Sequence, residues 1–386
     1  MLPWRSHTYS KAGKNAGINK QIISRANETA RFLRQQNNNL PTILTLKHLS
    51  KLSGAPYNFL RRSVEHSDPE PYRLFRIHKR LLADESKRRY RIICVPEKKL
   101  MAVQRWINGE ILQKIKPHPA SVAFGPGNSI IAAAEPHCGS RWIVKLDIKN
   151  FFESVSEQQV FHVFSRLGYQ PLVAFELARL TTRKGKRSYA RSAKRWSKNF
   201  NLDYSISAYN EILLGHLPQG APTSPMLANL AMFDFDEAVT DLANSAQLEY
   251  TRYADDLTFS TSSEEFSRKD AKKFIGNIYS KLKAFDFEPN LTKTKIVPPG
   301  ARKIVLGLLV DGDKPRLTKE FRDNIRQHLY YMTEANIGPV IHASTKGFIS
   351  VYGLKNHVRG LIAHAAQIDP DYANKAWQKF NSVRWP

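Results

Sequence analysis

The stretch LEYTRYADDLTFSTS, residues 248–262, decides the expected fold, because it places two acidic residues between two strand-like runs. LEYTRY and LTFSTS are both rich in the β-branched and aromatic residues that favour strands. Asp255 and Asp256 stand side by side between them. The stretch therefore predicts a β-hairpin with two adjacent carboxylates at its tip.

Such a carboxylate pair poses an electrostatic problem. Two carboxylates that converge on one space suppress each other's ionisation unless a cation neutralises them. Carboxylates with room for water and phosphate oxygens suit Mg²⁺. Asp147, at the end of the apolar run RWIVKLDI, is the expected third ligand, since a neighbouring strand would bring it beside the hairpin tip. The alternative is a solvated turn, which is the commoner context for two adjacent aspartates.

The charge of the chain indicates a polyanionic partner. Lys and Arg number 59 against 34 Asp and Glu in 386 residues, a net charge of +25. Nucleic acid and an anionic membrane both fit this charge. With no apolar run of roughly 20 residues and no signal-peptide core, we expect a soluble, cytoplasmic protein that binds nucleic acid and no membrane. Three carboxylates, Mg²⁺ and a basic surface together predict two-metal phosphoryl transfer.

Hydrophobic patterning favours an α+β fold with an antiparallel sheet. Strands are expected at residues 90–95, 141–148, 248–253, 257–262 and 303–312, partly joined by short turns. Helices are expected at 100–115 and at 156–168, where Ser156 and Gln159 form a capping box and Gly168 follows the last turn. Three more follow Pro315, in RLTKEFRDNIRQHLYYM, GFISVYGLKNHVRGLIAHAAQ and DPDYANKAWQKF.

The first eighty or so residues are expected to be helical and basic. Leucines at 46, 49, 52 and 60 follow a mostly helical spacing around a Gly-Ala-Pro break. A helix-turn-helix and a helical cap on the next domain both fit this pattern. Cys94 and Cys138 lack metal-ligand spacing and are expected to be two buried thiols.

Residues 183–198 form a basic segment with eight Lys or Arg, interleaved with Tyr189 and Trp196. Cations with aromatic residues suit phosphate contact and base stacking. A solvated charged loop is the alternative.

Six ordered blocks resemble those of reverse transcriptases. They are YRIICVP, LDIKNFF, LPQGAPTSPMLANL, YADD, NLTKTKIV and KIVLGLLV, and they fall within residues 87–331. The resemblance implies a right-hand polymerase with fingers, an antiparallel palm and a helical thumb. The implied domains are a helical N-terminal extension (1–85), fingers (86–125), a palm with a basic insertion near 183–200 (126–310) and a thumb (311–386).

The same resemblance implies roles for individual residues. Asp147, Asp255 and Asp256 would hold two Mg²⁺ ions, assisted by the Ile148 carbonyl. Residues at the nucleotide would be Arg91 on the triphosphate, Gln219 and Gly220 beside base and sugar, Phe152 against the ribose 2′-hydroxyl, and Lys293 as a charge partner. Each of three roles has an alternative. Phe152 could be an ordinary core residue, Arg91 could lie on a solvated strand edge, and Lys293 could be an exposed lysine without a role.

The chain resembles the bacterial retron group in particular, since no ribonuclease H, maturase or endonuclease segment is evident. AAEPH resembles the group's Asn-Ala-x-x-His signature, with Ala133 in the asparagine position and His137 retained, whereas VLG at 305–307 replaces Val-Thr-Gly. The group copies a structured noncoding RNA (msr-msd) into RNA-linked DNA (msDNA) from a guanosine 2′-hydroxyl, in defence against phage. The implied partners are that RNA and its DNA product, dNTPs, a separate effector protein and host ribonuclease H.

RNA contacts are expected from two basic regions and one histidine. In the helix at 318–332, three cations share one face at three- and four-residue spacing, although a solvated face is equally compatible. The candidates are His137, Arg183, Lys184, Arg187, Arg191, Lys194, Arg195, Lys319, Arg322 and Arg326. Alternative functions are another bacterial reverse transcriptase (group II intron-like, diversity-generating or defence-associated) and a non-catalytic RNA-binding scaffold.

Overall fold

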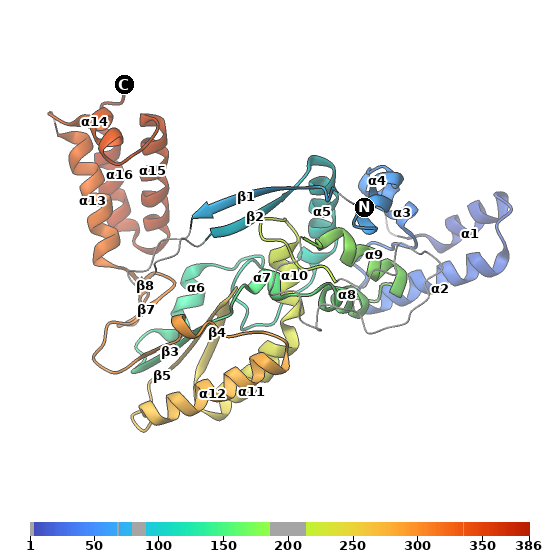
Figure 1. Cartoon of the computed structure of the whole chain (residues 1–386), viewed down its shortest axis with the longest axis horizontal. Helices are drawn as coiled ribbons and strands as arrows, with labels where there is room; N and C mark the ends of the chain where they lie inside the picture. Colours follow the sequence, from blue (N-terminus) through green and yellow to red (C-terminus); the bar gives the residue numbers. More distant parts are fainter. Residues whose placement is uncertain (1–3, 68, 79–89, 186–213, 335) are drawn as a thin grey trace.

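The structure, a computed structural model, describes residues 4–67, 69–78, 90–185, 214–334 and 336–386 (Figure 1). Along the longest axis, the C-terminal helices lie at one end and α1 and α2 at the other, with the main sheet between them. None of the helices in these ranges combines the length and the apolar character that crossing a bilayer requires.

The predicted antiparallel sheet forms the centre of the molecule and has four strands. Its strand order is β4-β5-β3-β6, with β4 Glu249–Tyr253, β5 Asp256–Thr261, β3 Trp142–Asp147 and β6 Lys295–Val297. The helices α11 (Phe233–Ser245) and α12 (Arg268–Ala284) cover one face (Figure 1). On that side Phe259 stacks on Tyr250, with ring centroids 4.7 Å apart, and meets Phe274 edge-on.

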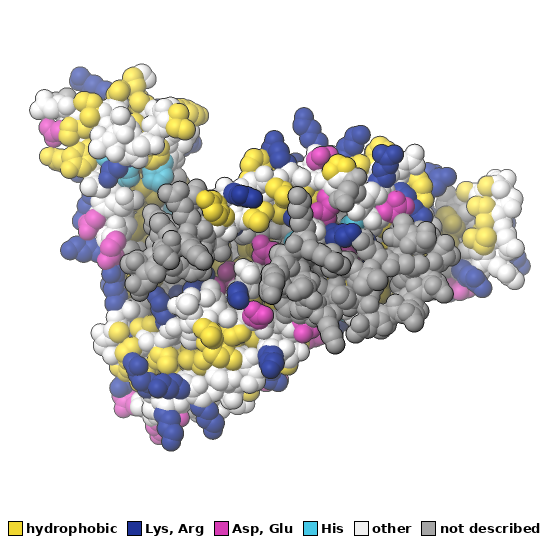
Figure 2. All heavy atoms as spheres, viewed as in Figure 1, with side chains coloured by type: hydrophobic (Ala, Val, Ile, Leu, Met, Phe, Trp, Pro, Cys, Tyr) yellow, Lys and Arg dark blue, Asp and Glu magenta, His cyan; other side chains and the backbone are white. Residues whose placement is uncertain are grey.

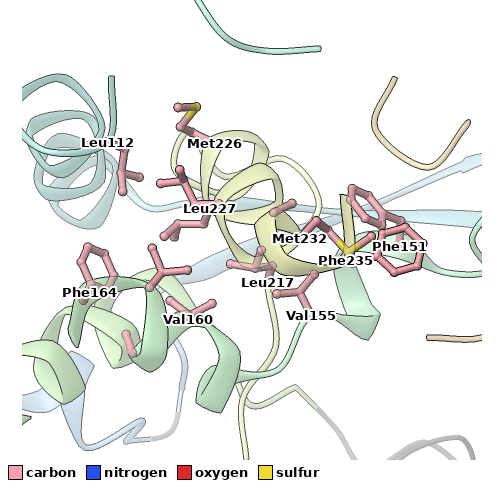
Figure 3. Packing of buried hydrophobic residues seen from close by; sticks show 14 of the residues in the cluster. Leu112, Phe151, Val155, Val160, Phe164, Leu217, Met226, Leu227, Met232 and Phe235 are labelled. Atoms are coloured by element: carbon pink, nitrogen blue, oxygen red, sulfur yellow. The ribbon is translucent and has the colours of Figure 1, made fainter. Parts of the chain in front are cut away.

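The main hydrophobic core joins this sheet to helices that precede and follow its strands in the sequence. Figure 3 shows Phe151, Val160, Phe164, Leu227 and Phe235 converging from several helices. They come from α7 (Phe151–Ser154), α8 (Glu157–Arg166), α10 (Ser224–Ala231) and α11, and α9 (Pro171–Thr181) also contributes to this core. The predicted capping box is present at α8, where Gln159 N donates to Ser156 Oγ. Gly168 follows this helix with φ +93°, as a helix stop requires.

The N-terminal helices share this core. They are α1 (Ser6–Asn15), α2 (Lys20–Gln36), α3 (Leu46–Ser53) and α4 (Tyr57–Val64). Leu49, Leu60 and Val64 are at most 1% exposed and belong to the same cluster as the sheet residues. The leucine pattern thus builds a helical cap packed on the rest of the molecule.

The expectation of helix throughout the first eighty or so residues is wrong at its end. Tyr72–His78 form the strand β1, which pairs antiparallel with β2 (Tyr90–Pro96). The expected domain boundary after residue 85 therefore falls between the two strands of one hairpin. The helix expected at 100–115 ends earlier, as α5 (Lys98–Glu110) followed by the 3-10 turn η1 (Leu112–Lys114).

Residues 303–312 form a hairpin and not the single strand expected. The strands β7 (Ile304–Val305) and β8 (Leu308–Leu309) pair antiparallel, and β9 (Arg316–Leu317) extends the sheet. Leu306 and Gly307 have φ +48° and +83°, the combination that a type I′ turn requires. The VLG motif at 305–307 thus includes the turn, which apolar periodicity could not indicate.

The C-terminal helical unit has its own core. Its helices are α13 (Lys319–Thr333), α14 (Gly338–Thr345), α15 (Val351–Ile368) and α16 (Pro370–Asn381), of which α14 was not anticipated. Ile325, Leu354, Val358 and Ile362 are fully buried in a cluster separate from the main one. The remaining described elements are α6 (Ile130–Ala134), η2 (Glu135–His137) and η6 (Leu291–Lys293).

Candidate active site

Two of the three predicted acids lie directly opposite each other in the sheet. In the β3–β5 register, Asp147 pairs with Asp256. Ala254 and Asp255 form the two-residue turn between β4 and β5, where Ala254 takes φ +56°. The backbone N–H of Ile148 donates to the Asp255 carbonyl over 2.9 Å, which fastens this turn to the end of β3. Strand pairing therefore brings together carboxylates more than a hundred residues apart.

A short segment before β6 contacts the buried Asp147, which is 3% exposed. Asn290 Nδ2 donates to Asp147 Oδ1 over 2.8 Å, and Lys293 Nζ donates to Oδ2 over 2.5 Å. Asn290 was not anticipated as a site residue. The contact of Lys293 with Asp147 shows that this lysine lies at the acid cluster.

The acids perturb one another's ionisation. Burial, together with the charges of Asp256 and Asp147, raises the pKa of Asp255 to about 6. Burial also raises the pKa of Asp256, although Lys145 opposes the shift. Burial acts to lower the pKa of Lys293, but its hydrogen bond to Asp147 and the three carboxylates outweigh burial and raise it. The cluster therefore carries more negative charge than its lysines offset, which favours an added cation.

Within the described ranges, no three Asp, Glu, His or Cys side chains stand in an arrangement that could hold a metal ion. Lys293 Nζ contacts the Asp147 oxygen that would be needed for such a site. The donor set nevertheless fits a hard divalent cation in kind, because it consists of carboxylate oxygens. Binding such an ion through Asp147 Oδ2 requires Lys293 to release that atom.

A buried ion pair holds the turn from behind. Arg252 Nε and Nη2 donate to the two carboxylate oxygens of Asp236 over 2.7 and 2.6 Å, and both side chains are 0% exposed. Arg252 Nη1 donates to the Ala254 carbonyl over 3.1 Å. Sequence reasoning missed this pair, since an arginine in a half-apolar strand gives no indication that its partner lies on α11.

The predicted nucleotide-pocket block packs against the β1–β2 hairpin. Cys94 N donates to the Gln219 carbonyl over 2.7 Å. Gly220 has φ +108°, and a Cβ there would lie 2.7 Å from Ile93 Cγ2. Arg91 is exposed and lies two residues from Ile93, hence on the same face of the strand. The structure thus brings Arg91, Gln219 and Gly220 to one region.

A cluster of three aromatic side chains lies beside the acid turn. Phe152 is partly buried, and its ring centroid lies 6.3 Å from that of Phe124, which lies 6.1 Å from Tyr253. The Phe152 side chain is therefore neither fully buried in the core nor fully exposed. Phe124, 39% exposed and at φ +61°, was not anticipated, and its neighbours in AFGPG were the available signal.

Two of the predicted RNA contacts, His137 and Arg183, are engaged by other side chains of the protein. His137 is 0% exposed, and its ring nitrogens lie 2.7 Å from Ser260 Oγ and from Thr251 Oγ1. Arg183 Nη2 donates to Glu70 over 2.8 Å, and its guanidinium covers the Tyr72 ring. The spacing of the motif and of the charges does not reveal burial. The backbone N–H of Lys184 also donates to Glu70, over 2.5 Å.

Two of the three cations in the predicted row on α13 are ion-paired with acidic side chains of the protein. Lys319 is exposed, whereas Arg322 donates to Asp369 over 2.6 Å and Arg326 to Asp323 over 3.0 Å. Helical spacing alone could not show which cations pair with neighbouring helices. On the face in Figure 2, Lys and Arg side chains are spread over several elements and do not gather in one patch. Arg187, Arg191, Lys194 and Arg195 lie outside the described residues.

Comparison with known proteins defines the class. The family model described as reverse transcriptase (RNA-dependent DNA polymerase) matches residues 77–307. The chain therefore belongs to the reverse transcriptase family and is an RNA-directed DNA polymerase with an α+β, right-hand architecture. Polymerases of this kind use divalent metal ions.

The similar curated proteins narrow the class to the retron type. The chain is 29% identical to the retron Ec86 reverse transcriptase of Escherichia coli, covering 90% of this chain and 96% of that protein. It is 30% identical to the E. coli retron Ec73 reverse transcriptase, covering 82% and 90%. For the retron Mx65 reverse transcriptase of Myxococcus xanthus the identity is 29%, covering 74% and 60%. The chain is thus a retron-type reverse transcriptase.

Among solved structures, a telomerase from Candida albicans gives a TM-score of 0.40 at 12% identity, covering 86% of this chain and 66% of that one. A similarity this distant adds nothing to the assignment.

Proposed function

We propose that the chain copies part of a structured noncoding RNA into single-stranded DNA, starting from a guanosine 2′-hydroxyl, so that the product stays linked to the RNA. The observation that carries the chemical part is the register of the sheet, which sets Asp147 opposite Asp256 with Asp255 in the adjoining turn. The similarity to retron reverse transcriptases supports the choice of template.

The three acids would hold two Mg²⁺ ions, assisted by the Ile148 carbonyl. When bound, these ions would lower the pKa of the attacking hydroxyl and neutralise the leaving pyrophosphate. The protein's own part is to fix the acids: Arg252 secures the turn from within, and Asn290 orients Asp147. Lys293 offsets part of the cluster's negative charge before the substrate arrives and would then be free to contact phosphate oxygens.

The incoming dNTP would lie between the acid turn and the β1–β2 hairpin. Arg91 would contact its triphosphate, and Gln219 and Gly220 would line the base and sugar. The ring of Phe152 would exclude a ribose 2′-hydroxyl by steric contact, with Phe124 packed beside it. The exposed face of Arg91 and the close approach of Gly220 to Ile93 support this placement.

The proposed partners are the cognate RNA, its DNA product, host ribonuclease H and a separate effector protein, acting together in defence against phage. The exposed Lys319 and the high net charge support a broad, base-independent contribution to RNA affinity.

The test is to purify the protein with its nucleic acid from its host and treat the product with a 2′,5′-debranching enzyme. A retron product releases linear DNA and shifts in a denaturing gel. An Asp255→Asn, Asp256→Asn double variant serves as the control and should carry RNA but no DNA. Linear cDNA without a branch would refute the priming proposal, and DNA synthesis by the double variant would refute the assigned metal ligands.

A further inference from the structure

We infer that a groove on the N-terminal helices binds one unpaired nucleotide of a nucleic-acid strand, away from the polymerase site. Two hollows of about 280 and 260 Å³ lie there, and Trp4, Arg34 and Asn38 line both. Because they share these three residues, the hollows adjoin and form one groove beside α2. We refer to it as the Trp4 groove.

The size of the Trp4 groove limits its ligand. Each hollow is slightly smaller than the roughly 300–1,000 Å³ of sites that enclose drug-sized molecules. Each half has room for a planar base or for a sugar-phosphate group. A single nucleotide, with its base in one half and its phosphate in the other, matches this division.

The indole of Trp4 is held in place and partly exposed. Its ring N–H donates to Asn27 Oδ1 over 3.3 Å, and its backbone carbonyl accepts from Arg34 Nη1 over 3.3 Å. The rings of Tyr9 and His48 lie 4.5 and 6.5 Å from it, centroid to centroid. A fixed, partly exposed aromatic ring is the usual stacking platform for unpaired bases.

The charge of the Trp4 groove favours phosphate. Arg34 lines both halves, Lys114 lines one and Arg31 the other, and none of the lining residues that the structure describes is acidic. Lys114 also pairs with Glu110 over 2.9 Å, so the two arginines carry most of the free positive charge. Over residues 4–67 the sequence has eleven Lys or Arg against two Glu. An anionic strand is thus attracted to this end of the molecule.

Amide side chains give the groove hydrogen-bonding capacity. Asn38 and Asn39 are exposed at its edge, and side-chain amides can both donate to and accept from base edges. Figure 1 places α2 at the end of the molecule opposite the C-terminal helical unit. The groove is therefore separate from the acid cluster. The inference rests on the proposed function only in taking nucleic acid as the ligand.

The experiment measures binding of labelled ten-nucleotide oligo(rU) and oligo(dT) to the full chain freed of nucleic acid. Trp4→Ala should weaken binding about fivefold or more, the loss expected for one stacked base. Arg34→Ala should weaken it and lower the slope of log affinity against log salt by about 0.7. Arg25→Ala, an exposed arginine on the same helix that does not line the groove, is the matched control and should stay within twofold.

Two further arms settle the outcome. Trp4→Phe, which keeps an aromatic ring, should recover most of the affinity, which a folding defect in Trp4→Ala would not explain. Oligomers carrying 4-thiouridine or 4-thiothymidine should crosslink to residues 4–39. Losses shared by oligo(rU) and oligo(dT) assign the shared nucleotide chemistry, and a loss confined to oligo(rU) assigns RNA. Wild-type affinity in both groove variants, or crosslinks only to the sheet and C-terminal helices, would overturn the inference.

The groove and the proposed function can fail separately. Trp4→Ala should extend a saturating annealed primer-template at the wild-type rate, because the groove lies outside the acid site. If the wild type makes no DNA yet the groove variants lose oligonucleotide affinity, the proposed function fails and the groove stands. If DNA synthesis is normal and the variants bind like the wild type, the groove fails alone.

Discussion

Arg252 on β4 and Asp236 on α11 form a fully buried, bidentate ion pair next to the Ala254–Asp255 turn. The third guanidinium nitrogen, Nη1, donates to the carbonyl of Ala254, the residue before Asp255. The pair thus links the position of a catalytic candidate to the packing of a helix on the far side of the strand.

Breaking this pair should impair both stability and turnover. Asp236→Asn leaves the Arg252 charge uncompensated in the interior and should cost about 3–5 kcal/mol in the free energy of unfolding, measured with urea. Arg252→Lys keeps the charge but cannot make both the bidentate contact with Asp236 and the hydrogen bond to the Ala254 carbonyl. The turn should therefore be less well positioned, so that kcat falls while KM for dNTP changes little.

The matched control is an exposed ion pair whose acid, Asp234, lies two residues before Asp236 on α11 and whose arginine, Arg166, lies on α8. Arg166 and Asp234 form a similar two-pronged pair whose side chains are 63% and 49% exposed. Arg166→Lys should cost about 0–1 kcal/mol. Equal effects at the two pairs would contradict the role of burial.

Asp255→Asn should abolish DNA synthesis and stabilise the metal-free protein. The pKa of Asp255 is raised to about 6 in the folded state, so its ionised form opposes folding. This cost is absent below about pH 4, grows as pH rises and is complete above about pH 6. After allowance for partial exposure, we expect a gain of about 1–2 kcal/mol at pH 7.5 that shrinks towards pH 4.

Urea unfolding of both proteins across this pH range provides the measurement. Added Mg²⁺ should narrow the difference, because only the wild type gains a counter-charge. Identical stability of the two proteins at pH 7.5 would show that the carboxylates do not repel one another.

Phe152→Ala should relax discrimination against ribonucleotides by about 10-fold or more, since a pocket that loses bulk rejects an added hydroxyl less strongly. The ratio of kcat/KM for dNTP and rNTP measures this. Phe161→Ala, which removes another partly buried ring packed on the same core, controls for general loss of packing. Unchanged selectivity would leave Phe152 as a packing residue.

Gly220→Ala should weaken dNTP use, because the backbone there has φ +108° and a Cβ would meet Ile93 at 2.7 Å. The backbone strain alone should cost about 1–3 kcal/mol, felt at the β1–β2 hairpin as a higher KM. Gly276→Ala is the control: within α12 it meets open space and should stabilise the protein by up to about 1 kcal/mol.

His137→Ala should destabilise the fold without changing RNA affinity per folded molecule. Its removal leaves the buried hydroxyls of Ser260 and Thr251 without their ring partner, at a cost of about 1–3 kcal/mol. Unfolding and RNA titrations should be compared on the same preparation. A loss of RNA affinity at unchanged stability would restore the sequence-based prediction of an RNA contact.

The sequence by itself determined the chemistry and the class of fold. The proximity of Asp147, Asp255 and Asp256 could be predicted from strand-like runs that end in acids, and the antiparallel sheet from β-prone runs joined by short turns. Local rules also sufficed for the α8 capping box and the stop at Gly168, because these depend on neighbours within a few residues.

Only the tertiary structure decided which polar residues face the interior. His137 and Arg183 carry the residue types of RNA contacts, yet His137 is enclosed beside the sheet and the partly buried Arg183 is paired with Glu70. Asn290, Arg252 and Asp236 became site residues because strand pairing and helix packing brought them beside Asp147 and Ala254. Residue type and spacing encode local conformation and chemistry, whereas burial and pairing arise from contacts between segments distant in the sequence.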